Sequence, residues 1–244
     1  QRRRVAMTYV ATLVVAQAIW AVLIFIDMPV WQTFAVMAVP MAIELAGPFI
    51  AERKDGGTPW HPHHIAECYG LLAIIALGEG VVGTVASVSA SVEVSGWSLD
   101  AVLLCVAGTG LTFGMWWMYF LVPSGAMLHR HRDRSFFWGY GHMVVFAAIA
   151  ATGSGLHVAA YFIEHKAHIG AAATVLTVAV PVAVYVASLY IIYNRLTRRY
   201  EAFYGMMLVM IALATIAGVV FDRRDVAAFV AKPHDVVEGE RDAH

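Results

Sequence analysis

The sequence is poor in charged residues, which make up only 14% of its 244 positions. A soluble globular domain carries about 25% charged residues, so this composition excludes an ordinary soluble domain. Hydrophobic residues account for 60% of the chain. Its apolar stretches repeatedly reach the roughly 18 residues that mark a membrane-spanning helix. The composition therefore predicts a multi-pass membrane protein, whose first partner is the lipid bilayer.

Cysteine, lysine and net charge are scarce as well. The two cysteines, Cys68 and Cys105, show no spacing typical of a metal site or a disulfide framework. The net charge of −1 offers no basic surface, so no nucleic-acid partner is expected. The three lysines, Lys54, Lys166 and Lys232, all lie in polar segments. Their positions exclude a retinal-type Schiff base inside the membrane.

The hydropathy pattern predicts an all-α, polytopic transmembrane helix bundle of about seven spans. The expected spans are residues 7–26, 30–51, 65–90, 99–122, 136–163, 171–193 and 203–221. We expect residues 1–221 to form the bundle and residues 222–244 to form a polar tail. The segment LHRHRDR, residues 128–134, is expected to be a basic loop. The chain starts QRRR without methionine, so we expect further residues upstream.

The basic residues of the loops predict the orientation. Most of them fall on the side where the chain starts: Arg2, Arg3, Arg4, Arg53, Lys54, Arg130, Arg132, Arg134, Arg195, Arg198 and Arg199. The positive-inside rule then puts the start of the chain in the cytoplasm, with the bundle in the cell's inner membrane. Seven spans would leave the tail outside, where Arg223 and Arg224 fit poorly. A miscounted span is the alternative.

The third expected span carries a glutamate near its middle. Glu79 would lie close to the bilayer midplane, where an unpaired charge costs roughly 2.5 kcal/mol or more. Gly78, Gly80 and Gly83 surround it and would let a neighbouring helix approach closely. We therefore expect Glu79 to face into the bundle. It would serve there either as a hydrogen-bonded packing group or as an acid in a hydrated ion path.

Three histidines, His61, His63 and His64, precede the same span, and Glu67 follows one turn later. Nitrogen and oxygen ligands at such short spacing suit zinc, so His63, His64 and Glu67 are candidate metal ligands. Two simpler roles stay open. Glu67 would offset the helix dipole from the first turn, and the histidines would order the start of the helix.

His142 and Glu44 are the other ionisable groups expected inside spans. At about 1.5 Å per residue they lie about 9 and 10 Å from the cytoplasmic ends of their helices, so they share a level. A histidine–carboxylate pair keeps both groups tolerable in lipid and can relay protons. The alternative is a neutral imidazole bonded to a backbone carbonyl. Only His142 lies well inside a span, so a bis-histidine haem is not expected, and we expect no cofactor.

Small residues also recur at helical spacing. Gly110 and Gly114 form a Gly-x-x-x-Gly motif in the fourth span, and Gly153 and Gly155 form a close pair in the fifth. Small residues allow helix backbones to approach each other in membranes. We expect both sets to be packing seams.

The run H-x-H-H-I-A-E-x-Y-G-L-x-x-I-I-x-L-G-E resembles the signature of the bacterial low-temperature-requirement A (LtrA) family. The matching residues are His64, Glu67, Tyr69, Gly70, Leu71, Ile74, Ile75, Leu77, Gly78 and Glu79. Residues 139–157, with an early histidine and a small-residue run, are similar to a later helix of that family. Cys68 stands where the family usually has arginine, so no cation lies on the face of Glu79 here. The resemblance implies a membrane protein and no particular reaction.

Three functions fit these observations. The first is a transporter or channel-like protein for an ion or small solute, with a polar path of Glu79, Glu44, His142 and Glu67. The second is a membrane enzyme or metal-dependent protein that uses the histidines and Glu67. The third is an accessory or scaffold subunit that binds helices of other proteins through its glycine seams.

Overall fold

The computed structural model describes residues 2–52, 59–197 and 205 of the chain. They are helical apart from short connections, and no strand occurs in these ranges. Two compact units divide the chain, one comprising residues 1–61 and the other residues 62–244.

The first unit is a helical hairpin of α1 (Arg2–Leu23) and α2 (Val30–Glu52). The helices approach closely at Gly47, where a Cβ atom would lie 2.6 Å from the Thr12 hydroxyl oxygen. At one end of the hairpin, the Tyr9 hydroxyl donates a hydrogen bond of 2.8 Å to the Glu52 carboxylate. The hairpin is thus held by a small-residue contact and by polar side-chain bonds between its two helices.

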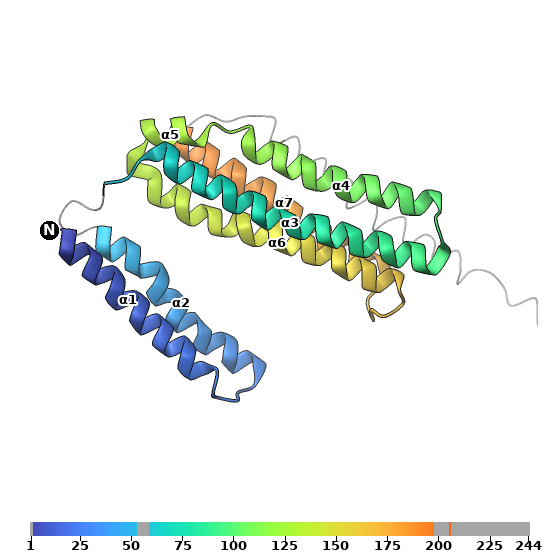
Figure 1. Ribbon diagram of the computed structural model, residues 1–244, viewed down its shortest axis with the longest axis horizontal. Helices are drawn as coiled ribbons and strands as arrows, with labels where there is room; N and C mark the ends of the chain where they lie inside the picture. Colours follow the sequence, from blue (N-terminus) through green and yellow to red (C-terminus); the bar gives the residue numbers. More distant parts are fainter. Residues whose placement is uncertain (1, 53–58, 198–204, 206–244) are drawn as a thin grey trace, which may run out of the picture. The chain divides into compact units, whose positions relative to one another are not determined.

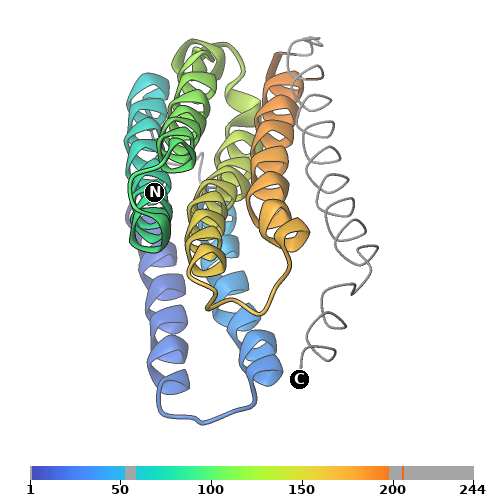
Figure 2. The same cartoon turned by 90° about the vertical axis from the view of Figure 1, so that its right-hand side faces the viewer.

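The second unit is a bundle of four long helices (Figures 1 and 2). They are α3 (Pro62–Ser95), α4 (Leu99–Phe120), α6 (Ser135–Ile163) and α7 (Ala171–Thr197). The short α5 (Ser124–Arg130) and the 3-10 turn η1 (Arg132–Arg134) connect α4 to α6. Helix α3 packs against α4, α5 and α6, while α6 also packs against α7. Helices α3 and α6 therefore form the centre of the unit.

The inward face of α3 is made of small or apolar residues. Gly70, Ala73, Leu77, Gly80 and Thr84 are all buried and follow one another at alternating steps of three and four. That spacing keeps them on one side of a helix, which is the side that packs against neighbouring helices.

The seam between α3 and α4 has a reciprocal arrangement. A Cβ at Gly80 would lie 2.6 Å from the Thr112 hydroxyl, and a Cβ at Gly108 would lie 2.5 Å from the Thr84 hydroxyl. Each threonine donates to the glycine four residues before it, at 2.7 Å from Thr84 to Gly80 and 3.1 Å from Thr112 to Gly108. The hydroxyls are satisfied within their own helices, so the seam needs no water.

The seam between α3 and α6 is also tight. A Cβ at Gly83 would lie 2.7 Å from the Gly153 carbonyl oxygen. Ser87 donates a hydrogen bond of 2.6 Å to the Leu156 carbonyl across this seam. Gly155 packs against α7, because a Cβ at this position would collide with the Thr177 carbonyl oxygen. The predicted packing seam at Gly153 and Gly155 is confirmed.

No described helix packs against the predicted seam at Gly110 and Gly114. Both glycines are exposed, and a Cβ at either position would meet no atom of the described residues within 4 Å. The buried side of α4 instead carries Gly108, Thr112 and Met115. A Gly-x-x-x-Gly motif indicates that a helix has a small face, but it does not indicate that a neighbour covers that face.

The predicted all-α, membrane-spanning class is confirmed. Within the described ranges, six helices are long and apolar enough to cross a membrane. The seventh expected span, residues 203–221, lies outside the described residues except for residue 205, as does the expected polar tail.

The segment expected to be a basic loop is folded. Residues 124–130 form α5 and residues 132–134 form η1. Leu128 is fully buried in the core of the unit, and the Arg134 guanidinium donates to the carbonyl oxygens of Arg195 and Leu196. Leu128 thus anchors this segment in the core, and the Arg134 cation binds the C-terminal end of α7, where a helix favours positive charge.

Candidate functional site

A pocket of about 500 Å³ opens at the end of the second unit where α3 begins. Helix α3 contributes His63 and Glu67, α4 contributes Tyr119, and the start of α5 contributes Ser124. The remaining lining is mostly apolar. The pocket thus gathers a carboxylate, an imidazole and hydroxyl-bearing residues in one hollow.

Helical spacing explains why His63 and Glu67 share this pocket. They are four residues apart on α3, so their side chains lie on the same face. Gly125 of α5 lies against the imidazole, because a Cβ there would come within 2.6 Å of His63 Nδ1. The absence of a side chain at Gly125 therefore makes room for His63.

His142 lies inside the unit, with only 2% of its surface exposed. Its Nδ1 atom is 2.7 Å from the Trp138 carbonyl oxygen. A carbonyl oxygen can only accept, so Nδ1 carries the proton and Nε2 is left as an acceptor. This bond confirms the predicted alternative of an imidazole held by a backbone carbonyl.

Four aromatic rings enclose the His142 imidazole. The ring centroids lie 4.1 Å away for Trp138, 5.1 Å for Tyr69, 5.7 Å for Tyr119 and 5.7 Å for Phe146. Tyr69 and Tyr119 both meet the imidazole edge-on. The imidazole is therefore shielded from lipid by rings of which three carry a polar N–H or O–H group.

Tyr119 connects the pocket to His142. Its side chain lines the pocket and also contacts the imidazole edge-on. Only 6% of its surface is exposed, and its hydroxyl has no hydrogen-bond partner in the described part of the chain. A buried hydroxyl without a hydrogen-bond partner costs about 1–3 kcal/mol of stability, which makes the Tyr119 hydroxyl a candidate functional group. No motif or spacing in the sequence singles out this tyrosine.

Glu79 lies at the seam of α3 and α6, yet its side chain is exposed. A Cβ at Gly153 would lie 2.7 Å from both the carbonyl carbon and the Cβ of Glu79, so the two backbones nearly touch. The inward positions of α3 are taken by Leu77 and Gly80. Within the second unit, the Glu79 side chain therefore does not face the packed core. The prediction that it faces into the bundle is wrong for this unit.

A family model described as bacterial low temperature requirement A protein (LtrA) matches residues 1–231. The chain belongs to the LtrA family. Comparisons with curated proteins and with solved structures gave no match.

The residues that carry the LtrA likeness lie along the first half of α3. Glu67 lines the pocket, Gly70 faces Phe120 of α4 and Leu77 lies in the core. Cys68 departs from the pattern of the family and is exposed, with its sulfur 3.8 Å from His64 Nε2. The family pattern thus combines residues of the packed core with four residues that line the pocket, Glu67, Gly70, Leu71 and Ile74.

The candidate metal ligands do not converge. His63 and Glu67 line the pocket, whereas His64 is directed toward Cys68. Across residues 2–52 and 59–197, no three His, Cys, Asp or Glu side chains lie close enough to hold one metal ion. The geometry therefore lends no support to a site of His63, His64 and Glu67.

The two groups expected to pair each have a partner within their own unit. In the hairpin of this LtrA-family chain, Gln17 donates a hydrogen bond of 3.0 Å to the Glu44 carboxylate. His142 is bonded to Trp138 in the second unit. The partner Gln17 was missed, although a glutamine inside an apolar stretch is itself a sign of a polar contact.

Proposed function

We propose that this LtrA-family chain conducts protons across the membrane, through a path that begins at Glu67 and passes Tyr119 to His142. One observation carries the proposal: the buried, unpartnered Tyr119 hydroxyl belongs to a side chain that touches both the pocket and the imidazole. Ionisable groups inside a membrane commonly mark ion pathways and proton relays.

The chemistry of these groups suits a relay. Glu67 at the pocket can take up a proton from water and release it again. A tyrosine hydroxyl both donates and accepts hydrogen bonds, and the Nε2 atom of His142 is an acceptor while Nδ1 is bonded. An imidazole can accept a proton at one ring nitrogen and release a proton from the other, which is what a relay requires. In this proposal the positive-inside rule makes the pocket the cytoplasmic mouth of the path.

Glu67 is the first residue to test. In liposomes, Glu67→Gln is expected to slow proton flux by about tenfold or more, because the amide cannot titrate. Cys68→Ser is the matched control, since Cys68 is adjacent on α3, exposed and outside the pocket lining. It should retain the flux of the wild type. Full flux in Glu67→Gln would remove this residue from the path.

Glu79 is the next acidic residue along α3 after Glu67 and is a candidate for a later step of the path. It lies about 18 Å beyond Glu67 along the helix axis, too far for a single hydrogen bond. If it couples proton movement, Glu79→Gln should fold with comparable thermal stability and lose pH-dependent flux in liposomes. A fully active variant with normal pH dependence would show that the carboxyl has no coupling role.

A second candidate function is association with other membrane helices. The observation that favours it is the bare glycine face of α4, where Gly110 and Gly114 are exposed. Small residues on an open helix face allow close contact with another helix. Stable association of the wild-type chain with another helix, together with no proton flux, would favour this function over the first.

A further inference from the structure

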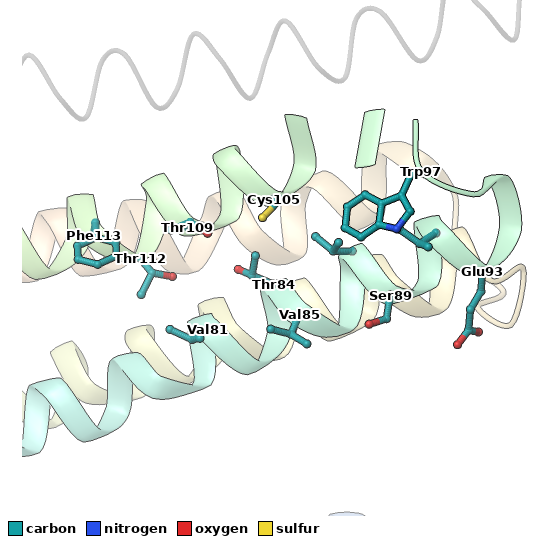
Figure 3. A pocket seen from close by; sticks show the side chains of 12 residues that line it. Val81, Thr84, Val85, Ser89, Glu93, Trp97, Cys105, Thr109, Thr112 and Phe113 are labelled. Atoms are coloured by element: carbon teal, nitrogen blue, oxygen red, sulfur yellow. The ribbon is translucent and has the colours of Figure 1, made fainter. Parts of the chain in front are cut away.

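A groove of about 480 Å³ lies between α3 and α4, in the half of the unit away from His63. Figure 3 shows that both helices line it and that the Trp97 indole lies at one end. Its walls include Val81, Val85 and Val88 on α3 and Cys105 and Phe113 on α4. The groove has no residue in common with the pocket at Glu67.

The groove is suited to an apolar occupant. Thr84 and Thr112 lie at its base, but both hydroxyls donate to carbonyl oxygens of their own helices. They offer no free donor to a column of water or to an ion. Ser89 and Thr109 also line the groove, but the valine side chains, the Phe113 ring and Trp97 make most of the wall apolar, so hydrocarbon is the chemistry that fits.

The length of the groove fits one acyl chain. The α3 wall from Val81 to Val92 rises about 16 Å at about 1.5 Å per residue. Half of a bilayer's hydrocarbon core is roughly 15 Å. Trp97 at the end of the groove is of the residue type that lies at the level of lipid headgroups.

Both signs of charge lie at that same end. The exposed Glu93 lines the groove beside Trp97. The Lys166 ammonium lies 2.7 Å from the Glu164 carboxylate. The hydrogen bond and charge of Glu164 raise the pKa of Lys166, and the charge of Glu93 acts in the same direction, so Lys166 lies within the field of both acids. A zwitterionic headgroup, with an ammonium for Glu93 and a phosphate for Lys166, complements this arrangement.

We propose that the groove binds an acyl chain of an amine-headed phospholipid, with the lipid ammonium hydrogen-bonded to Glu93. A primary ammonium donates hydrogen bonds, whereas a choline headgroup has no N–H to donate. The groove should therefore favour phosphatidylethanolamine over phosphatidylcholine.

Cys105 reports on the occupant, because it is exposed and lies in the groove (Figure 3). Cys68→Ser leaves Cys105 as the single thiol of the chain. This variant is placed in phosphatidylcholine vesicles with and without phosphatidylethanolamine, and its alkylation by a lipid-soluble maleimide is timed. We expect phosphatidylethanolamine to slow the alkylation severalfold, and Glu93→Gln on the same background to abolish the difference.

Cys105→Ser, which retains Cys68 outside the groove, is the control for general effects of the lipid on the reagent. Its alkylation should be the same in both lipids. Equal rates at Cys105 in the two lipids would overturn the proposal, as would a lipid difference that persists in Glu93→Gln. If the protection of Cys105 depends on the protein-to-lipid ratio and not on the headgroup, the occupant is a second copy of the chain. That result would also overturn the proposal.

Discussion

Replacing Gly153 with alanine is expected to lower the thermal unfolding midpoint by roughly 10 °C, even though alanine is the better helix former. The added Cβ would lie 2.7 Å from the carbonyl carbon and the Cβ of Glu79 and 2.9 Å from its carbonyl oxygen. These are mainly backbone atoms of α3, and they cannot turn aside as the end of a flexible side chain can. Overpacking of this kind costs about 1–3 kcal/mol, and contact with backbone puts Gly153→Ala at the upper end.

Gly110→Ala is the matched control. Gly110 is also inside a long helix, but a Cβ there would meet no atom within 4 Å in the part of the chain that the structure describes. Alanine has less backbone freedom to lose on folding than glycine, so this variant should gain up to about 1 kcal/mol in its free energy of unfolding. Its unfolding midpoint should therefore stay equal or rise. Thermal unfolding of the two variants in the same detergent measures the difference. Equal midpoints would show that the α3–α6 seam does not set the stability of the unit.

Tyr119→Phe is expected to reduce proton flux by about tenfold or more while leaving the protein at least as stable as the wild type. The phenyl ring keeps the contacts with His142 and Phe120. The substitution removes only a buried hydroxyl that has no partner among the described residues, so no bond of the fold is lost. If Tyr119 is a relay residue, the variant should lose flux without losing stability. If Tyr119 only packs, this combination is not expected.

Tyr185→Phe provides the opposite case. The fully buried Tyr185 donates a hydrogen bond of 2.6 Å from its hydroxyl to the Met115 carbonyl. Its loss should cost about 1 kcal/mol of stability. Because Tyr185 does not line the pocket and is not among the rings around His142, flux should be retained. If both variants lose flux equally, the effect of Tyr119→Phe is not specific to the path.

Much of the fold could be predicted from hydropathy, because a helix that crosses a bilayer must be long and apolar and must satisfy its own backbone hydrogen bonds. The ranges expected for α2 and α6 end within a residue of the observed ones. The rotation of each helix was harder to predict. Glycines surround Glu79 on α3, yet Gly80 is buried against Thr112 while Gly78 is open. Composition alone did not tell these two positions apart.

The candidate site was predictable only in part. Glu67 and His142 stand out because ionisable residues are rare in apolar stretches. Tyr119 does not, since a tyrosine near the end of a span is ordinary in an aromatic belt. Its proposed role rests on tertiary contacts with α3 and α6, and no spacing along α4 encodes them. The Gln17 partner of Glu44 likewise depends on how α1 and α2 align.

Proton flux through the purified chain tests the proposed path most directly. The wild-type chain is reconstituted in liposomes that contain a pH-sensitive dye, a pH gradient is imposed, and a potassium ionophore compensates the charge. We predict that the dye responds faster than in protein-free liposomes and that Tyr119→Phe, at equal protein content, removes most of the increase. A wild-type response no faster than that of protein-free liposomes would contradict the proposed path.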